Sequence, residues 1–100
     1  MQFLLFYDYA ADYLQRRAEF RNAHLELAWA SQARGEMILG GALDDPLDAA
    51  VMLFQCESPE VIAAFVNADP YVRNGLVTQW RIRRWHTVVG DQAVQPVRPD

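Results

Sequence analysis

The order of strand-like and helix-like segments constrains the fold of this chain more than any other feature of its sequence. Residues 2–9 are apolar at both alternating sets of positions, which is typical of a strand covered on both faces. Residues 13–34 are rich in Ala, Leu, Glu, Gln and Arg and lack Gly and Pro, so they predict a long helix. Gly35 then predicts the end of that helix. Residues 37–43 and 50–56 predict two further strands.

The second half of the chain supplies another helix and another strand. Ser58 and Pro59 are typical of a helix start, with Ser as the capping residue and Pro at the first helical position. Asp69 followed by Pro70 predicts the end of this helix, because Pro disfavours helical backbone at the residue before it. A short loop then leads to a fourth strand over residues 76–86.

The resulting order, strand-helix-strand-strand-helix-strand, is that of a split βαβ unit. Right-handed crossovers place both helices on one face of a four-stranded antiparallel sheet whose central strands are the first and the third. We therefore predict an α+β, ferredoxin-like domain over residues 1–88 and a C-terminal tail over residues 89–100. The other face of the sheet still carries apolar side chains, so we expect a second copy of the chain to cover it in a homodimer.

Composition limits both the chemistry and the partners. The chain carries 13 acidic residues against 9 arginines, for a net charge of −4, and it has no lysine. The missing lysine excludes a Schiff base on Lys, and the acidic balance argues against nucleic acid or an anionic membrane as partner. No segment approaches the roughly 20 apolar residues of a membrane span. Cys56 is the only cysteine, which excludes an intrachain disulfide and fits a cytoplasmic location.

Two histidines are the first candidates for acid–base chemistry. His24 lies in the predicted first helix one turn after Phe20, so it points toward the core or its rim when that face meets the sheet. A buried histidine needs a hydrogen-bond partner, and His24 is therefore either a hydrogen-bonded core residue or an acid–base group. His86 has no spacing to His24 that supports a metal site, and no phosphate-binding glycine motif is present. The sequence predicts neither a metal ion nor a cofactor.

Asp69 is the candidate partner for His24. In a ferredoxin-like layer the two helices lie side by side, so the loop after the second helix can be a neighbour of the first. Asp69 can equally be a turn residue before proline, which is a common use of Asp. A carboxylate at a helix C-terminus is mildly unfavourable with the helix dipole, which indicates some other reason for its presence.

The chain resembles the YCII-related (YciI-like) family in two stretches. Residues 69–77, Asp-Pro-Tyr-Val-Arg-Asn-Gly-Leu-Val, and the following residues 80–85 look like the C-terminal signature of that family. Residues 21–35, followed by Gly40 and Gly41, are similar to its first helix and next strand. The resemblance spans about residues 2–86, nearly the whole domain. Two positions depart from the pattern by lacking a proline that members often carry, Asn22 and Ala42.

The resemblance implies a fold of the dimeric α+β barrel type and a His–Asp pair regarded as the active site, which falls on His24 and Asp69. Activities of family members lean toward lyase or isomerase-type proton chemistry on small ring compounds. We therefore expect His24 to act as general base or acid without a cofactor, with Asp69 fixing its tautomer and stabilising the imidazolium. Tyr71, as a hydroxyl donor, and Arg73, as a charge for an anionic substrate, are candidate substrate-binding residues. Their structural alternatives are a packing residue and a solvated loop residue.

Two other classes of function stay open. In a non-catalytic ligand-binding or accessory module, the same pair would only gate a pocket for a small molecule. In a purely structural dimer, no pocket would exist near His24. We interpret the arginines of the fourth strand as protection of a sheet edge and the tryptophans as core or interface anchors. These residues are Arg81, Arg83 and Arg84, and Trp29, Trp80 and Trp85.

Overall fold

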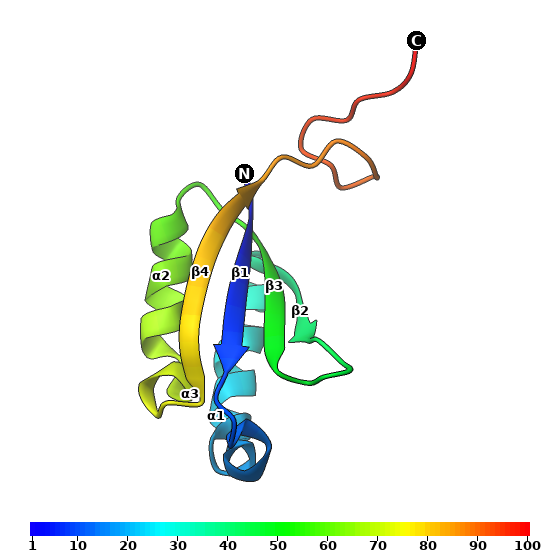
Figure 1. Ribbon diagram of the computed structural model, residues 1–100. Coiled ribbons are helices and arrows are strands. Elements are labelled where there is room, and N and C mark those ends of the chain that lie inside the picture. Colours follow the sequence, from blue (N-terminus) through cyan, green and yellow to red (C-terminus); the bar gives the residue numbers. More distant parts are fainter.

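Four antiparallel strands form one sheet with the order β2-β3-β1-β4. They are β1 (Gln2–Tyr9), β2 (Met37–Ala42), β3 (Ala49–Gln55) and β4 (Val77–Trp85). The computed structural model describes residues 1–100 and shows the helices together behind one face of this sheet (Figure 1). The ferredoxin-like α+β fold is therefore confirmed, with the first and third strands in the predicted central positions.

The helical layer consists of α1 (Tyr13–Ala33), α2 (Pro59–Ala68) and the short α3 (Pro70–Arg73). The first two are the predicted helices, and Gly35, with φ of 81°, follows the end of α1. The sequence reading of residues 70–75 as a plain loop was wrong, because they open with a helical turn. Asp69 and Pro70 repeat the Ser58–Pro59 start signal, a capping side chain followed by Pro at the first helical position. None of the helices is long and apolar enough to cross a membrane.

The core lies between the sheet and α2. Alternate residues of β1 and β3 point toward the helical layer, as the period of a strand requires. They meet the apolar face of α2, and the Phe54 and Phe65 rings pack edge to face with centroids 5.5 Å apart. The buried side chains from these three elements are Phe3, Leu5, Tyr7, Ala50, Met52, Phe54, Ile62, Phe65 and Val66.

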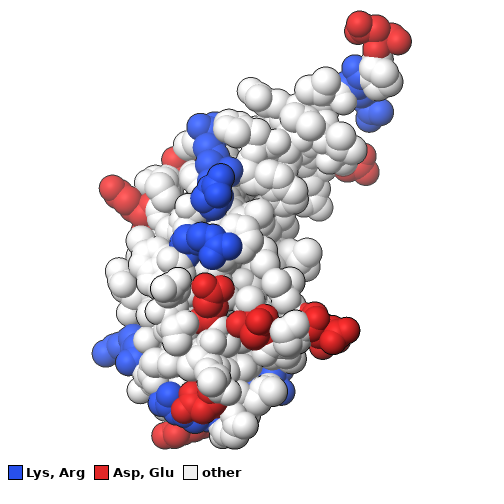
Figure 2. All heavy atoms as spheres, in the orientation of Figure 1, with Lys and Arg blue, Asp and Glu red and all other residues white.

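The opposite face of the sheet is open. Its apolar side chains, among them Phe6 and Val51, are only half-buried. In the register of the sheet, Arg81 pairs with Phe6, and its guanidinium carbon lies 4.4 Å from the Phe6 ring centroid. Figure 2 shows basic side chains over β4, with acidic side chains further down the same face. The arginines of β4 therefore contribute to this open face as well as to the sheet edge, and the homodimer across it stays a prediction.

Residues 86–100 form no helix or strand and extend away from the sheet (Figure 1). The buried Gln2 holds the base of this tail, since its Nε2 donates a hydrogen bond to the carbonyl of Gln92 at 3.0 Å. The Thr87 hydroxyl in turn donates to the Gln2 Oε1 at 2.8 Å. The first part of the tail is thus tied to the start of β1.

Candidate active site

A cavity of about 530 Å³ lies between α1 and the sheet. Its walls come from the inner side of α1, the whole of β2, the inward positions of β1 and β3, and the start of α3. Most of the lining is hydrophobic, and His24 is part of it. A cavity beside His24 contradicts the interpretation of the chain as a purely structural dimer.

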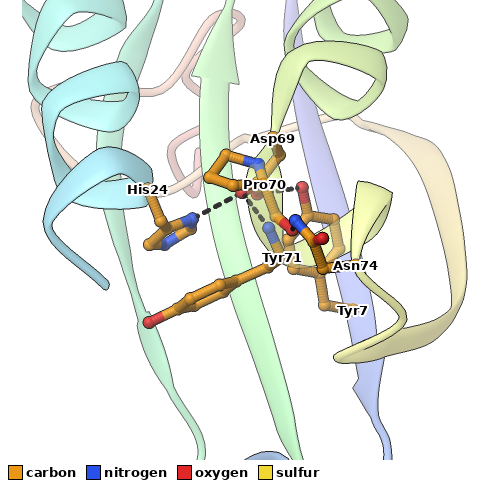
Figure 3. Close-up of polar contacts among 6 residues, drawn as sticks. All are labelled: Tyr7, His24, Asp69, Pro70, Tyr71 and Asn74. Carbon is orange, nitrogen blue, oxygen red and sulfur yellow. Dashed lines mark hydrogen bonds and ion pairs between the residues drawn. The ribbon is translucent and has the colours of Figure 1, made fainter. Parts of the chain in front are cut away.

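The structure brings the predicted pair together at the wall of this cavity (Figure 3). The Nδ1 atom of His24 lies 2.9 Å from the Oδ1 atom of Asp69, although the two residues are 45 positions apart. The His24 side chain is 15% exposed, whereas the Asp69 side chain is fully buried. The imidazole therefore reaches solvent or a ligand, while the carboxylate behind it does not.

Asp69 holds two further groups besides His24. Its Oδ2 accepts a hydrogen bond from the Tyr7 hydroxyl at 2.7 Å, and its Oδ1 accepts one from the Tyr71 backbone N–H at 3.0 Å. The second bond is the N-cap of α3, so Asp69 sits at a favourable helix start as well as at the end of α2. The cap of α3 explains why a carboxylate occupies the C-terminal end of α2, where the helix dipole alone disfavours it. Three donors together compensate for the burial of a carboxylate.

The contact with Asp69 decides which nitrogen of His24 is available. Because the carboxylate accepts a hydrogen bond, the neutral imidazole carries its proton on Nδ1 and leaves Nε2 as the basic nitrogen. The imidazole also stacks on the Tyr71 ring, with centroids 3.9 Å apart and an angle of 8° between the planes. The ring is thus fixed in both tautomer and orientation, as a general base requires.

All four tyrosines of the chain line the cavity, namely Tyr7, Tyr9, Tyr13 and Tyr71. The Tyr9 and Tyr13 rings stack with centroids 3.6 Å apart, and Tyr71 meets Tyr13 edge to face. Burial raises the pKa of the Tyr7 hydroxyl, and the neighbouring Asp69 carboxylate raises it further. Burial likewise raises the pKa of Tyr9 and of Tyr71. These hydroxyls are therefore neutral hydrogen-bonding groups at physiological pH.

The two candidate substrate-binding residues lie in different places. Tyr71 is buried and lines the cavity, whereas Arg73 is exposed at the end of α3 and does not line it. The cations on the cavity wall are Arg17 and Arg21 of α1. Sequence reasoning missed both, although their spacing to His24 places all three residues on one stripe of the helix.

Trp29 is another cavity residue whose role the sequence did not show. It was interpreted as a core or interface anchor, but it is 66% exposed and lines the cavity from α1. The only available signal was its position five residues after His24, on the same side of the helix as Leu25 and Gln32. Trp80 and Trp85 are also exposed rather than part of the core.

β2 forms the outer wall of the cavity and approaches β3 closely at Gly40. A Cβ atom at Gly40 would lie 2.9 Å from the Met52 Cγ atom and 3.3 Å from the Met37 Sδ atom, so a larger residue would push these side chains aside. The pairing of β2 with β3 shifts register between Met37 and Leu39. No three His, Cys, Asp or Glu side chains come together in a group that could hold a metal ion.

Comparison with models of known protein families identifies the family of this chain. The model of the YCII-related domain matches residues 1–86, which include every side chain of the site just described. The chain belongs to the YCII-related family. The match ends one residue after β4, so the tail lies outside the family domain. Among curated proteins, no sequence matches this YCII-related chain significantly.

Solved structures of other proteins share the fold, among them the following two. One is the 5-chloro-2-hydroxyhydroquinone dehydrochlorinase TftG of Burkholderia phenoliruptrix AC1100, in complex with 2,5-dihydroxybenzoquinone. Its TM-score is 0.74 at 24% identity, over 87% of this chain and 95% of TftG. The other is protein Atu4242 of Agrobacterium tumefaciens, with a TM-score of 0.57 at 12% identity, over 94% of this chain and 98% of that one. At these identities the similarity shows the fold alone.

Proposed function

We propose that this YCII-related protein is a cofactor-independent enzyme of the lyase or isomerase type that moves a proton on a small ring compound. One observation carries the proposal: a fully buried carboxylate holds His24 by Nδ1 at the wall of a mostly apolar cavity. This arrangement leaves Nε2 as a positioned base, because the only other nitrogen of the ring is occupied.

Each residue of the proposed mechanism has a separate task. Nε2 of His24 accepts a proton from the bound ring, and the Asp69 carboxylate stabilises the imidazolium that forms. The same imidazolium then returns the proton, either to another atom of the ring or to a departing group. Tyr7 holds the second oxygen of Asp69, which keeps the carboxylate from rotating away from His24.

The size and lining of the cavity support a small ring as substrate. A volume of about 530 Å³ accommodates one substituted ring, and ligand sites of this kind are typically several hundred Å³ and mostly apolar. TftG, which shares the fold, acts on a chlorinated hydroxyhydroquinone and was solved with a dihydroxybenzoquinone. A hydroxylated six-membered ring is therefore the first substrate class to test.

The test compares His24→Gln with His86→Gln, a matched change of the exposed histidine after β4. Wild type is assayed with hydroxylated and chlorinated ring compounds, including 5-chloro-2-hydroxyhydroquinone, by chloride release and by ring absorbance. We expect His24→Gln to lower turnover by about 10²–10⁴-fold, the usual contribution of a general base, while His86→Gln has no effect. Circular dichroism melting checks that both variants fold.

Equal turnover by wild type and His24→Gln would contradict the proposal. The ligand-binding alternative makes a different prediction. It requires wild type to bind 2,5-dihydroxybenzoquinone in the cavity without converting any compound of the series.

We also propose that the protein is a homodimer through the open face of the sheet. The half-buried apolar side chains of this face, Leu4, Phe6, Val51 and Leu53, form a surface that a second copy would cover. Val51→Glu should convert the dimer to a monomer in light scattering after gel filtration. Ala64→Glu, which adds the same charge on the exposed side of α2, should leave the dimer intact. A monomeric wild type would rule this interface out.

A further inference from the structure

The charged side chains that line the cavity directly are arginines, while the Asp69 carboxylate lies buried behind His24. Arg17 and Arg21 line the cavity together with His24, and no Asp or Glu side chain lines it. In a chain with a net charge of −4, this is a local reversal of the overall charge. A concave site with apolar walls and charges of one sign concentrates ligands of the opposite sign.

Neither arginine is engaged with a carboxylate of the protein. The ion pairs between arginine and acidic side chains involve other residues, Arg16 with Asp12 and Arg34 with Glu36. The guanidinium carbon of Arg17 instead lies 5.8 Å from the centroid of the Tyr13 ring. Arg17 and Arg21 are one helical turn apart on α1, so both guanidinium groups can approach a single ligand atom or group.

The positive charge extends to the part of the cavity next to His24. Burial raises the pKa of the Tyr71 hydroxyl, and the guanidinium groups of Arg21 and Arg17 act on that pKa in the opposite direction. The Tyr71 ring stacks on His24, and its hydroxyl points away from Asp69 (Figure 3). Arg17, Arg21, His24 and Tyr71 thus line one cavity, with the imidazole stacked on the Tyr71 ring.

Aromatic side chains form much of the remaining wall. The stacked Tyr9 and Tyr13 rings form part of the cavity wall, and Trp29 lines the cavity from α1. Flat aromatic surfaces favour flat ligands, because stacked and edge-to-face contacts need planar partners. The wall thus combines selection for a planar ring with selection for negative charge.

We propose that the cavity selects planar rings that carry an ionised oxygen, and that Arg17 and Arg21 bind this oxygen while the ring lies against His24. This inference rests on the proposed function, since it names the substrate class of the same site. The ionised oxygen is of the phenolate or enolate type, which is the charge that a hydroxylated quinone or an acidic phenol presents. Arginine suits such an oxygen because its planar fork offers several N–H donors.

The test measures binding of two probes by isothermal titration calorimetry, independently of turnover. 2,5-Dihydroxybenzoquinone is an anion at neutral pH, because each hydroxyl is conjugated with a quinone carbonyl, and 2,5-dimethoxybenzoquinone is its neutral counterpart. We expect Arg17→Gln and Arg21→Gln each to weaken binding of the anion by about tenfold, the loss of one charge-assisted hydrogen bond. Binding of the neutral probe should stay unchanged in both variants.

The matched control is Arg34→Gln. It removes one arginine charge at the C-terminal end of α1, and Arg34 does not line the cavity. It should bind both probes as wild type does. The inference fails if wild type binds both probes equally or binds neither. It also fails if Arg17→Gln, Arg21→Gln and Arg34→Gln all weaken binding of the anionic probe to the same extent. None of these results concerns proton transfer by His24, which the turnover assay of His24→Gln decides separately.

Discussion

The helices α1 and α2 lie on the same face of the sheet but differ in how much they contribute to the hydrophobic core. α2 has 10 residues and buries Ile62, Phe65 and Val66 against β1 and β3. α1 has 21 residues and buries only Tyr13 and Ser31. The sheet is packed solid beneath α2 and is separated by a cavity from much of α1. Core contacts are therefore concentrated in α2 and the lining of the cavity in α1, although both helices belong to the same layer of the fold.

The side chains of α1 explain the difference. One stripe of its cavity side carries charged, polar or small residues, namely Arg17, Arg21, His24, Ala28 and Gln32. Leu25 and Trp29 also line the cavity from α1, but both side chains are exposed. Charged groups need solvent or a partner, and Ala is too short to reach the sheet, so this stripe cannot fill the space above β2. In α2, by contrast, the buried side chains Ile62, Phe65 and Val66 are all aliphatic or aromatic and belong to the core over β1 and β3.

The largest expected effect is on stability and contrasts one aromatic residue from each helix. Phe65→Ala should lower the free energy of unfolding by about 3–5 kcal/mol, because it leaves a cavity in the core. Trp29→Ala should change it by less than about 0.5 kcal/mol, since a mostly exposed side chain loses little packing, yet it should weaken ring binding. Urea unfolding of both variants measures the two values. Similar losses in both would show that α1 stabilises the fold as α2 does.

A smaller effect is expected at Asp69, the residue that joins the two regions. Asp69→Ala should destabilise the protein by about 2–3 kcal/mol, because it removes the cap of α3 and leaves Tyr7 and His24 without their acceptor. Asp69→Asn keeps a capping oxygen and should lose only about 1 kcal/mol. It should nevertheless lower turnover by at least about 100-fold, because the imidazolium loses its countercharge.

Nitrogen-15 NMR of His24 checks the cause of that loss. In wild type, the neutral ring should carry its proton on Nδ1, and Asp69→Asn should reduce the share of this tautomer. Asp91→Asn, a change of an exposed carboxylate in the tail, is the control. If Asp69→Asn retained both the tautomer and full turnover, Asp69 would be a capping residue without a role in proton transfer.

Much of this arrangement could be predicted from the sequence, because it depends on local signals. Short apolar runs between turn signals identified the strands, and the order of elements predicted the central position of β1 and β3. The juxtaposition of His24 and Asp69 followed from the side-by-side helices together with the resemblance to a family. α3 was missed because a proline after Asp was interpreted only as a stop, whereas the same dipeptide also begins a helix.

The cavity itself could not be predicted from the sequence. Helical spacing shows that Arg17, Arg21 and His24 share a face, but it does not show whether that face touches the sheet or stands away from it. That distance depends on the course of β2, which shifts register between Met37 and Leu39 and approaches β3 at Gly40. The residues missed in the site are therefore those whose role depends on a gap between two elements.

The multiple bonds of Asp69 limit how this protein can diverge from its relatives. One carboxylate caps the turn of α3 and also holds His24 and Tyr7, so a residue without a side-chain acceptor at position 69 would disturb the turn and the His24 ring at the same time. The side chains that line the cavity from α1 do not also cap a helix or turn in this way. Under the proposed function, single substitutions along α1 and β2 are therefore enough to change which ring the cavity accepts, and Asp69 with its turn can stay as it is.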